Sequence, residues 1–142
     1  MGAEGVALVA EGVARRAADG PERFGGDADE CYRLVRVAGE AASSKKAENT
    51  VILEVGPLIG ITDYFVITSA SNPRQVRTVA EEIEAQVRQA GRSGSPSTEG
   101  LDDARWVLLD YGDFVCHVFL DEARAYYDIE RLWADAPRYE ID

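Results

Sequence analysis

The sequence predicts an α/β (α+β) fold in which a single β-sheet of about five strands packs against flanking helices. Two observations predict it. Short runs rich in β-branched residues alternate with segments whose apolar residues recur every three to four positions. Along the chain these segments give the order α-β-β-α-β-β-α, which is typical of one sheet covered by helices.

The chain is expected to hold one folded domain, at residues 29–137, between two extensions. Gly-Pro at 20–21 and Gly-Gly at 25–26 interrupt the weak apolar periodicity before residue 28. We therefore expect residues 1–28 to be a flexible N-terminal extension and residues 138–142 to be a C-terminal tail. Residues 1–27 lack a basic start followed by an apolar block, so a secretory signal is not expected.

The first half of the domain is expected to be a helix followed by two strands. Residues 29–46 place Tyr32, Leu34, Val35 and Ala38 near one helical stripe. The β-branched run TVILEVG at 50–56 predicts a strand, residues 58–62 a turn, and DYFVITSA at 63–70 a second strand.

The segment 72–90 has clear start and stop signals for a helix. Ser71 or Asn72 can cap it, Pro73 suits its first turn, and Gly91 ends it. Residues spaced i, i+3, i+4, i+7 and i+11 predict one buried face: Val76, Val79, Ala80, Ile83 and Val87. Residues 92–100 are expected to be a loop that can include a short edge strand.

The segment WVLLDYGDFVCHVF at 106–119 predicts a β-hairpin, with strands at 105–110 and 114–119 joined at Gly112. Asp121 is expected to cap a last helix, EARAYYDIERLW. Strand side chains alternate between faces, so Trp106 and Asp110 share one face and Tyr111 lies on the other. The neighbours Cys116 and His117 then point apart and cannot form a nucleophile–base pair. We interpret Cys116 as a core residue and His117 as structural.

Composition excludes several classes of function. The 142 residues have a net charge of −11; no apolar run is long enough to span a membrane. Two cysteines are too few for a disulfide framework and fit a reducing cytoplasm. There is no CxxC and no second histidine, so neither a metal site nor a cofactor is expected.

The acidic residues gather in the last third of the chain. Residues 99–142 hold twelve acids against four arginines, a net charge of −8. Such a surface repels phosphate backbones, so direct DNA or RNA binding is disfavoured and a basic protein partner is favoured. An equally good interpretation is that the acidity only keeps the protein soluble.

An enzyme is the alternative class. A divergent nucleotidyltransferase could use Ser69 and Ser71 before the helix at 72–90, with Asp110 and Asp113 as carboxylates. Two-metal phosphoryl transfer needs carboxylates that converge on one face. Asp110 and Asp113 are three apart and separated by a turn, so no catalytic residues are assigned.

Aromatic residues favour a binding surface instead. Seven of them crowd into residues 106–133, and Trp and Tyr are the residue types that anchor protein interfaces. Some must belong to the core, and at least one exposed patch is expected. They are Trp106, Tyr111, Phe114, Phe119, Tyr126, Tyr127 and Trp133.

Three stretches together resemble the ribosomal silencing factor family, also called the Iojap-like family. They are AASSKKAENTVILEV, ITDYFVITSASNPRQVRTVAEEIE and EGLDDARWVLLDYGDFVCHVFLDEARAYYDIERLW. The resemblance covers roughly residues 30–136. It implies a mixed sheet related to the nucleotidyltransferase fold without its catalytic carboxylates, a homodimer, and no enzyme activity.

The resemblance also implies a partner and a mechanism. Members bind large-subunit ribosomal protein fourteen on the 50S subunit, in the cytoplasm, and sterically block joining of the 30S subunit when nutrients fail. Cys116 stands where many relatives carry valine, which favours its core role. Carried over by position, Trp106, Asp110 and Tyr111 would form the partner-binding patch, with Tyr111 projecting beyond the sheet at the turn. Arg124 and Tyr127 would flank or support it.

Overall fold

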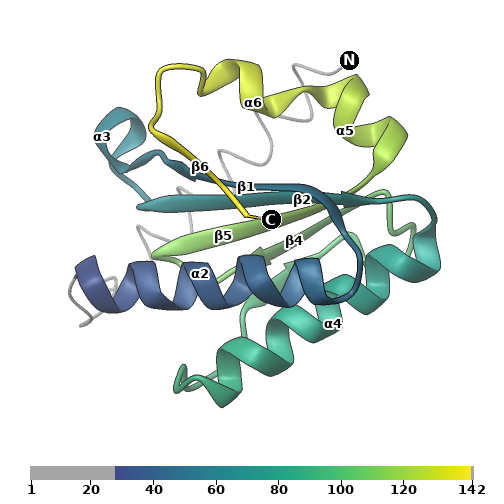
Figure 1. The fold of residues 1–142 in the computed structure, drawn as a ribbon, viewed down its shortest axis with the longest axis horizontal. Coiled ribbons are helices and arrows are strands. Elements are labelled where there is room, and N and C mark those ends of the chain that lie inside the picture. The colour runs from purple at the N-terminus through teal and green to yellow at the C-terminus, as the bar shows by residue number, and fades with distance from the viewer. Residues whose placement is uncertain (1–27, 142) are drawn as a thin grey trace.

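The computed structural model describes residues 28–141, and the expectations for residues 1–27 lie outside them. In the described part, six strands form one mixed sheet in the order β3-β4-β5-β2-β1-β6. Helices cover both faces of this sheet (Figure 1). The predicted α/β (α+β) class is therefore confirmed, with one strand more than the expected five. The relation to the nucleotidyltransferase fold, which only the resemblance implied, stays a prediction.

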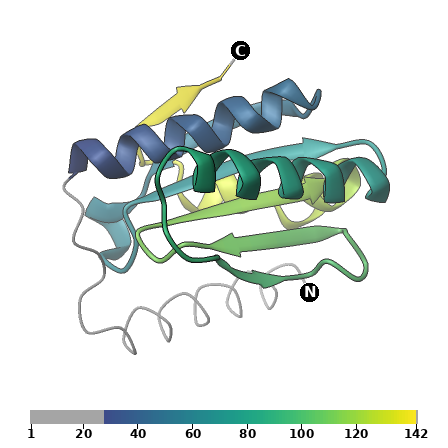
Figure 2. The same cartoon turned by 90° about the horizontal axis from the view of Figure 1, so that it is seen from below.

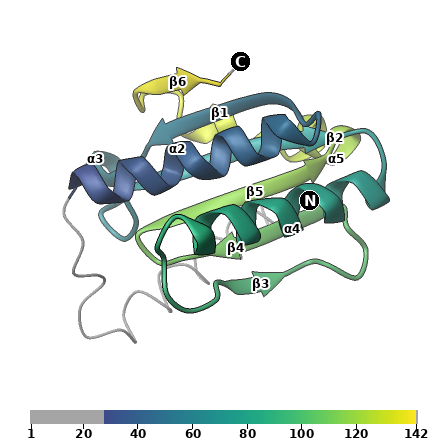
Figure 3. The ribbon, with the colours of Figure 1, turned by 60° about the horizontal axis from the view of Figure 1, so that its bottom comes forward.

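One face of the sheet is covered by the two long helices, α2 (Ala28–Ser44) and α4 (Pro73–Gln89), which lie side by side (Figure 3). In α4 the buried residues are the five that the periodicity predicted. Asn72 is the cap, since its Oδ1 accepts a hydrogen bond from the backbone N–H of Gln75 at 2.9 Å. Pro73 occupies the first turn, where its missing N–H leaves no backbone partner unsatisfied.

The centre of the sheet is formed by β1 (Glu48–Glu54), β2 (Tyr64–Ala70) and β5 (Phe114–Leu120). β1 and β2 are antiparallel, whereas β2 and β5 are parallel. All seven residues of β5 are buried, because helices cover both of its faces. This strand carries Cys116 and His117 into the core.

The edges of the sheet are short strands. β4 (Trp106–Asp110) forms the predicted hairpin with β5, and β3 (Ser97–Glu99) pairs with β4 at one edge (Figure 2). At the other edge, β6 (Arg138–Glu140) runs antiparallel to β1. The segment expected to be a tail thus supplies the sixth strand. All three β6 residues are exposed. Because none of them packs in the core, the segment does not show the alternation of apolar and polar residues that predicts a strand.

The second face is covered by two short helices where one was expected. α5 (Asp121–Tyr127) and α6 (Ile129–Leu132) are separated by Asp128, whose φ of +48° lies in the left-handed region. Aspartate tolerates this conformation better than most residues, so no glycine marks the break. Asp121 is the first helical residue and Leu120 takes the cap position without a side-chain bond, which corrects the expected cap.

A single helical turn, α3 (Gly56–Ile59), starts where the first strand was expected to end and overlaps the turn expected at 58–62. It ends at Gly60, which has φ +71° and donates its N–H to the carbonyl of Gly56.

Within the described residues, no helix combines the length and the apolar character that crossing a membrane requires.

Candidate functional site

The turn of the β4–β5 hairpin is fixed by its own hydrogen bonds. Gly112 has φ +91°, which glycine adopts without a steric penalty. Its N–H donates to Oδ1 of Asp110 at 2.8 Å, and the N–H of Tyr111 donates to the carbonyl of Phe114 at 3.0 Å. The hairpin is therefore a rigid platform, and the position of each side chain on it follows from strand alternation.

Trp106 joins the hairpin to α5. Its ring lies 4.7 Å from that of Tyr127 on α5 and 4.8 Å from that of Phe119 on β5, measured between centroids. It is half-buried, so one part of the indole belongs to the layer between sheet and helices while another part stays accessible. Trp133, which follows α6, contacts the same layer through Phe65, at 5.7 Å between centroids.

His117 lies beneath this layer and is fully buried. Its Nδ1 accepts a hydrogen bond from Nε1–H of Trp106 at 3.1 Å, and the ring of Phe65 meets it edge to face at 4.6 Å. Burial lowers the pKa of His117 to about 3. His117 is therefore neutral, and by accepting the indole hydrogen bond it orients Trp106. This is a structural role.

Two of the predicted binding residues are buried, which corrects the expectation that Tyr111 projects beyond the sheet. Asp110 is 5% exposed and Tyr111 is 7% exposed. Tyr111 stacks on Phe114 at 4.7 Å, with the Arg92 guanidinium 5.6 Å from its ring centroid. Arg92 also donates to the carbonyl of Tyr111 at 2.6 Å and pairs with Asp113 at 2.9 Å. Arg92, which comes from the loop after α4, was not predicted; nothing in its local sequence marks it.

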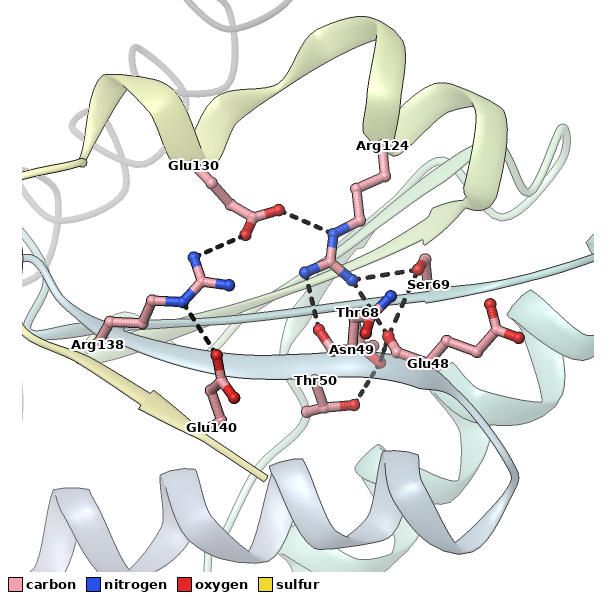
Figure 4. Close-up of polar contacts among 9 residues, drawn as sticks. All are labelled: Glu48, Asn49, Thr50, Thr68, Ser69, Arg124, Glu130, Arg138 and Glu140. Carbon is pink, nitrogen blue, oxygen red and sulfur yellow. Dashed lines mark hydrogen bonds and ion pairs between the residues drawn. The ribbon is translucent and has the colours of Figure 1, made fainter. Parts of the chain in front are cut away.

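Arg124 is a clamp at the start of β1, where the pairing with β2 has a bulge (Figure 4). Asn49 in this bulge has φ +51°. Arg124 donates to the carbonyls of Glu48 and Asn49 at 3.1 and 2.8 Å, and to Oγ of Ser69 at 3.1 Å. Its Nε donates to the Glu130 carboxylate at 2.8 Å. One side chain of α5 thus ties together α6, β1 and β2, whereas the expectation that Arg124 flanks or supports a partner-binding patch stays a prediction.

Glu130 extends this network to the edge of the sheet. Its second oxygen accepts from Arg138 on β6 at 3.1 Å, and Arg138 also lies 3.7 Å from Glu140 (Figure 4). Burial by itself would raise the pKa of Glu130, but hydrogen bonds and charge from Arg124 and Arg138 outweigh it and lower the pKa. The carboxylate therefore stays ionised and holds α6 against β6.

The exposed part of this region lies on the two short helices. Tyr126 is 53% exposed and Leu132 is 57% exposed, while Tyr127 and Trp133 are half-buried beside them in the sequence. Exposed acids lie in α5, between the two helices and after α6. We call this the α5–α6 surface: Tyr126, Tyr127, Leu132 and Trp133 with Glu122, Asp128 and Asp135. Sequence analysis named Tyr126 only as one of seven aromatic residues and missed Leu132, because the unforeseen break at Asp128 decides which side of each helix turns outward.

The four residues of the alternative enzyme site are not brought together. β2 and β5 are parallel with Ser69 opposite Phe119, so Ser69 lies at the far end of these strands from Asp113. Five to six strand residues separate the two ends, about 17–20 Å. Asp113 is paired with Arg92, and Oγ of Ser71 donates to Gln75 at 3.2 Å. Among the described residues, no group of three or more His, Cys, Asp or Glu is placed to hold a metal ion.

Comparison with known proteins gives a consistent match. A family model described as "Ribosomal silencing factor during starvation" matches residues 28–142. The chain is 38% identical over 109 residues to ribosomal silencing factor RsfS of Bacillus subtilis, and 39% identical over 109 residues to that of Halalkalibacterium halodurans. Each alignment covers 77% of this chain and 92% of the relative. A crystal structure of a Chromobacterium violaceum protein superposes with a TM-score of 0.69 at 31% identity, covering 72% of this chain and 85% of that one.

Proposed function

The chain belongs to the ribosomal silencing factor family, as the resemblance predicted, and we propose that it represses translation by occupying the large ribosomal subunit. In this proposal it binds large-subunit ribosomal protein fourteen on the 50S subunit and blocks joining of the 30S subunit under nutrient limitation. The action is steric: a folded 15.5 kDa chain stands where the other subunit would dock. Its place of action is then the cytoplasm, where the ribosomes are.

The observation that carries the proposal is the α5–α6 surface. It combines accessible aromatic and aliphatic side chains with exposed acids, on helices fixed to the sheet by Trp106 and Arg124. Interfaces are typically anchored by a few aromatic residues and oriented by charges around them. A basic ribosomal protein offers the opposite charge to this surface.

The five residues predicted to bind the partner take different roles in this proposal. Trp106 and Tyr127 are half-buried and offer the partner their accessible edges. Asp110, Tyr111 and Arg124 act from below, by holding the hairpin turn and the clamp at the start of β1. Contact with the partner falls mainly on residues that stand farther out, such as Tyr126 and Leu132.

The proposal includes a homodimer, which the resemblance implies. Light scattering on the purified chain measures its molar mass directly, and a mass near 15.5 kDa at micromolar concentration would contradict the dimer.

Sedimentation with purified ribosomal subunits tests the function. The protein is expected to sediment with 50S subunits, and 30S subunits added afterwards are expected to remain separate. If the protein stays in the supernatant, or if 70S particles form equally well with it bound, the proposal is wrong. A pull-down with isolated large-subunit ribosomal protein fourteen tests the partner separately. Binding to 50S subunits without binding to this protein would show that the subunit is the target but that another component is the partner.

Labelled nucleotide with magnesium or manganese tests the alternative. Incorporation that Asp110→Asn abolishes would favour the enzyme over the binding protein.

A further inference from the structure

The chain contains only two lysines, and they are consecutive. Lys45 and Lys46 form the loop between α2 and β1, and both are exposed. Arg74, also exposed, stands in the first turn of α4, and the end of α2 and the start of α4 lie at the same end of the molecule (Figure 3). In a chain of net charge −11, three exposed cations at one place are an exception. We call Lys45, Lys46 and Arg74 the basic corner.

The backbone beneath the basic corner is held in place by one side chain. Nε2 of Gln75 donates to the carbonyls of both Lys45 and Lys46, at 3.2 Å each. Oε1 of the same amide accepts from the N–H of Ser71 at 3.3 Å and from its Oγ at 3.2 Å. Gln75 thus fixes the lysine loop to the turn before α4. It also engages two carbonyl oxygens that would otherwise present negative partial charge beside the lysines.

The charges of the basic corner are unused within the folded chain. Among the described residues, none of its three side chains has a hydrogen bond or an ion pair. The one acid at residues 45–48 and 71–75, the two segments that form this corner, is Glu48. Six of the other arginines differ, whereas the side chains of Arg105 and Arg131 likewise have no hydrogen bond or ion pair among the described residues. Those with a carboxylate partner are Arg33, Arg36, Arg88, Arg92, Arg124 and Arg138.

Helix stability does not account for Arg74. The N-terminal end of a helix carries positive partial charge, so a cation in the first turn is unfavourable and an acid is favoured. α4 has no acid in its first turn and has Arg74 instead. Lys45 and Lys46 follow the C-terminal end of α2, where cations are favoured, so stability can explain the lysines but not the arginine.

We propose that the basic corner binds phosphates of ribosomal RNA on the large subunit, as a second contact beside the protein partner. The inference rests on the proposed function, which brings the chain to a particle whose surface is rich in phosphate. The inference restricts the earlier conclusion that the acidic net charge disfavours direct RNA binding. At physiological salt, charges interact over only about 8–10 Å, so a local group of cations can bind phosphate although the whole chain is acidic.

The placement of the two surfaces adds a geometric consequence. The basic corner belongs to the layer of α2 and α4, whereas the α5–α6 surface covers the opposite face of the sheet (Figure 1). A chain that uses both surfaces contacts ribosomal protein through the α5–α6 surface and ribosomal RNA through the basic corner. Its orientation on the subunit is then fixed from two sides.

Two variants that each remove three positive charges test the proposal. One is Lys45→Gln/Lys46→Gln/Arg74→Gln. The control is Arg36→Gln/Arg88→Gln/Arg105→Gln, which changes net charge equally but removes exposed or half-exposed arginines from α2, α4 and the residue before β4. Affinity for purified 50S subunits is measured over a range of KCl concentrations. Circular dichroism and light scattering first establish that each variant is folded and has the oligomeric state of the unchanged chain.

The expected result is a loss of salt dependence specific to the basic corner. The slope of log affinity against log salt should fall by about two to three, because each phosphate contact contributes roughly 0.7–0.9. Affinity near 0.1 M salt should fall roughly 10- to 100-fold. The control should stay within about threefold of the unchanged chain, since distant charges are screened.

Failure of this inference is distinguishable from failure of the proposed function. If the unchanged chain does not bind 50S subunits, the function is wrong. If it binds and the two triple variants have equal slopes, only the RNA contact is wrong. A basic-corner variant that loses its oligomeric state would show that these cations face a second copy of the chain, which also overturns the proposal.

A crosslink identifies the partner directly. Ser44 is exposed beside the lysines, and Cys31 and Cys116 are both buried. A photoreactive thiol reagent on Ser44→Cys is therefore expected to react at the new position and to crosslink to ribosomal RNA. Crosslinks to ribosomal protein alone would overturn the proposal.

Discussion

The indole Nε1–H of Trp106 donates a hydrogen bond to Nδ1 of His117, 3.1 Å away. Because His117 lies two residues before Phe119, the strand partner of Trp106, the bond runs diagonally across the hairpin. It requires an unprotonated Nδ1, so it holds only while the imidazole is neutral. Because the pKa of His117 is about 3 in the folded chain, this bond to the half-buried Trp106 persists at any pH well above that value.

Stability is expected to fall below about pH 6.5 because of His117. Its pKa is about 3 in the folded chain, against 6.5 ordinarily. Above pH 6.5 the group is neutral in both states and adds no pH dependence. Below pH 6.5 the unfolded chain binds a proton that the folded chain cannot, so the free energy of unfolding drops by about 1.4 kcal/mol per pH unit until the folded pKa is reached. Urea unfolding between pH 4.5 and 8 measures this slope.

His117→Asn is the matched control, since the Asn carbonyl can still accept from Trp106. The variant is expected to lose about 1–3 kcal/mol at pH 7.5 through the space left in the core. The difference in unfolding free energy between the two proteins should shrink as the pH falls from 6.5 to 4.5. A constant difference over this range would show that His117 is not the titrating group.

Substitutions of the exposed residues Tyr126 and Leu132 are expected to affect binding, whereas substitution of the half-buried Trp106 is expected to affect stability. Tyr126→Ser and Leu132→Ser remove side chains that are more than half exposed, so unfolding free energy should change by less than about 1 kcal/mol. Affinity for 50S subunits should fall roughly 30- to 1000-fold for an anchoring residue. Trp106→Ala should instead lose about 3–5 kcal/mol of stability. If both serine variants bind 50S subunits as the unchanged chain does, the α5–α6 surface is not the interface.

Arg124→Lys is expected to destabilise the chain although it keeps the charge. A lysine cannot reproduce the fork that reaches two carbonyls, Ser69 and Glu130 together. The loss should be about 2–3 kcal/mol, less than the roughly 3–5 kcal/mol for removing one partner of a buried ion pair, because lysine keeps the charge. Arg131→Lys on the exposed side of α6 is the control and should be neutral. Equal melting temperatures for the two variants would contradict the clamp.

Tyr111→Phe is expected to leave the chain as stable as before, or to stabilise it by about 1 kcal/mol. The Tyr111 hydroxyl is buried without a hydrogen-bond partner among the described residues, and removing an unsatisfied polar group is favourable. Tyr111→Ala should lose about 3–5 kcal/mol, because the ring fills space against Phe114 and Arg92. If Tyr111→Phe weakens 50S binding without loss of stability, Tyr111 belongs to the partner-binding patch, as the sequence analysis expected.

The sequence by itself determined the elements with strong local signals. Asn72, Pro73 and the apolar spacing from Val76 to Val87 define α4, since caps and periodicity act within one helix. Gly112 marked the hairpin turn, and alternation placed Trp106 and Asp110 on one face. The three quoted stretches predicted the family.

Only the tertiary structure decided what covers each face. Alternation tells which side of β4 a residue occupies, but burial depends on the layers packed there, so Asp110 and Tyr111 are enclosed where exposure was expected. The sequence did not predict β6, because a short edge strand with exposed side chains has no periodic pattern. Its pairing with β1 comes from backbone hydrogen bonds. Arg124 and Arg92 act on partners far away in the sequence, such as Asn49 and Tyr111. Long-range contacts of this kind depend on how the elements assemble, and no local signal specifies them.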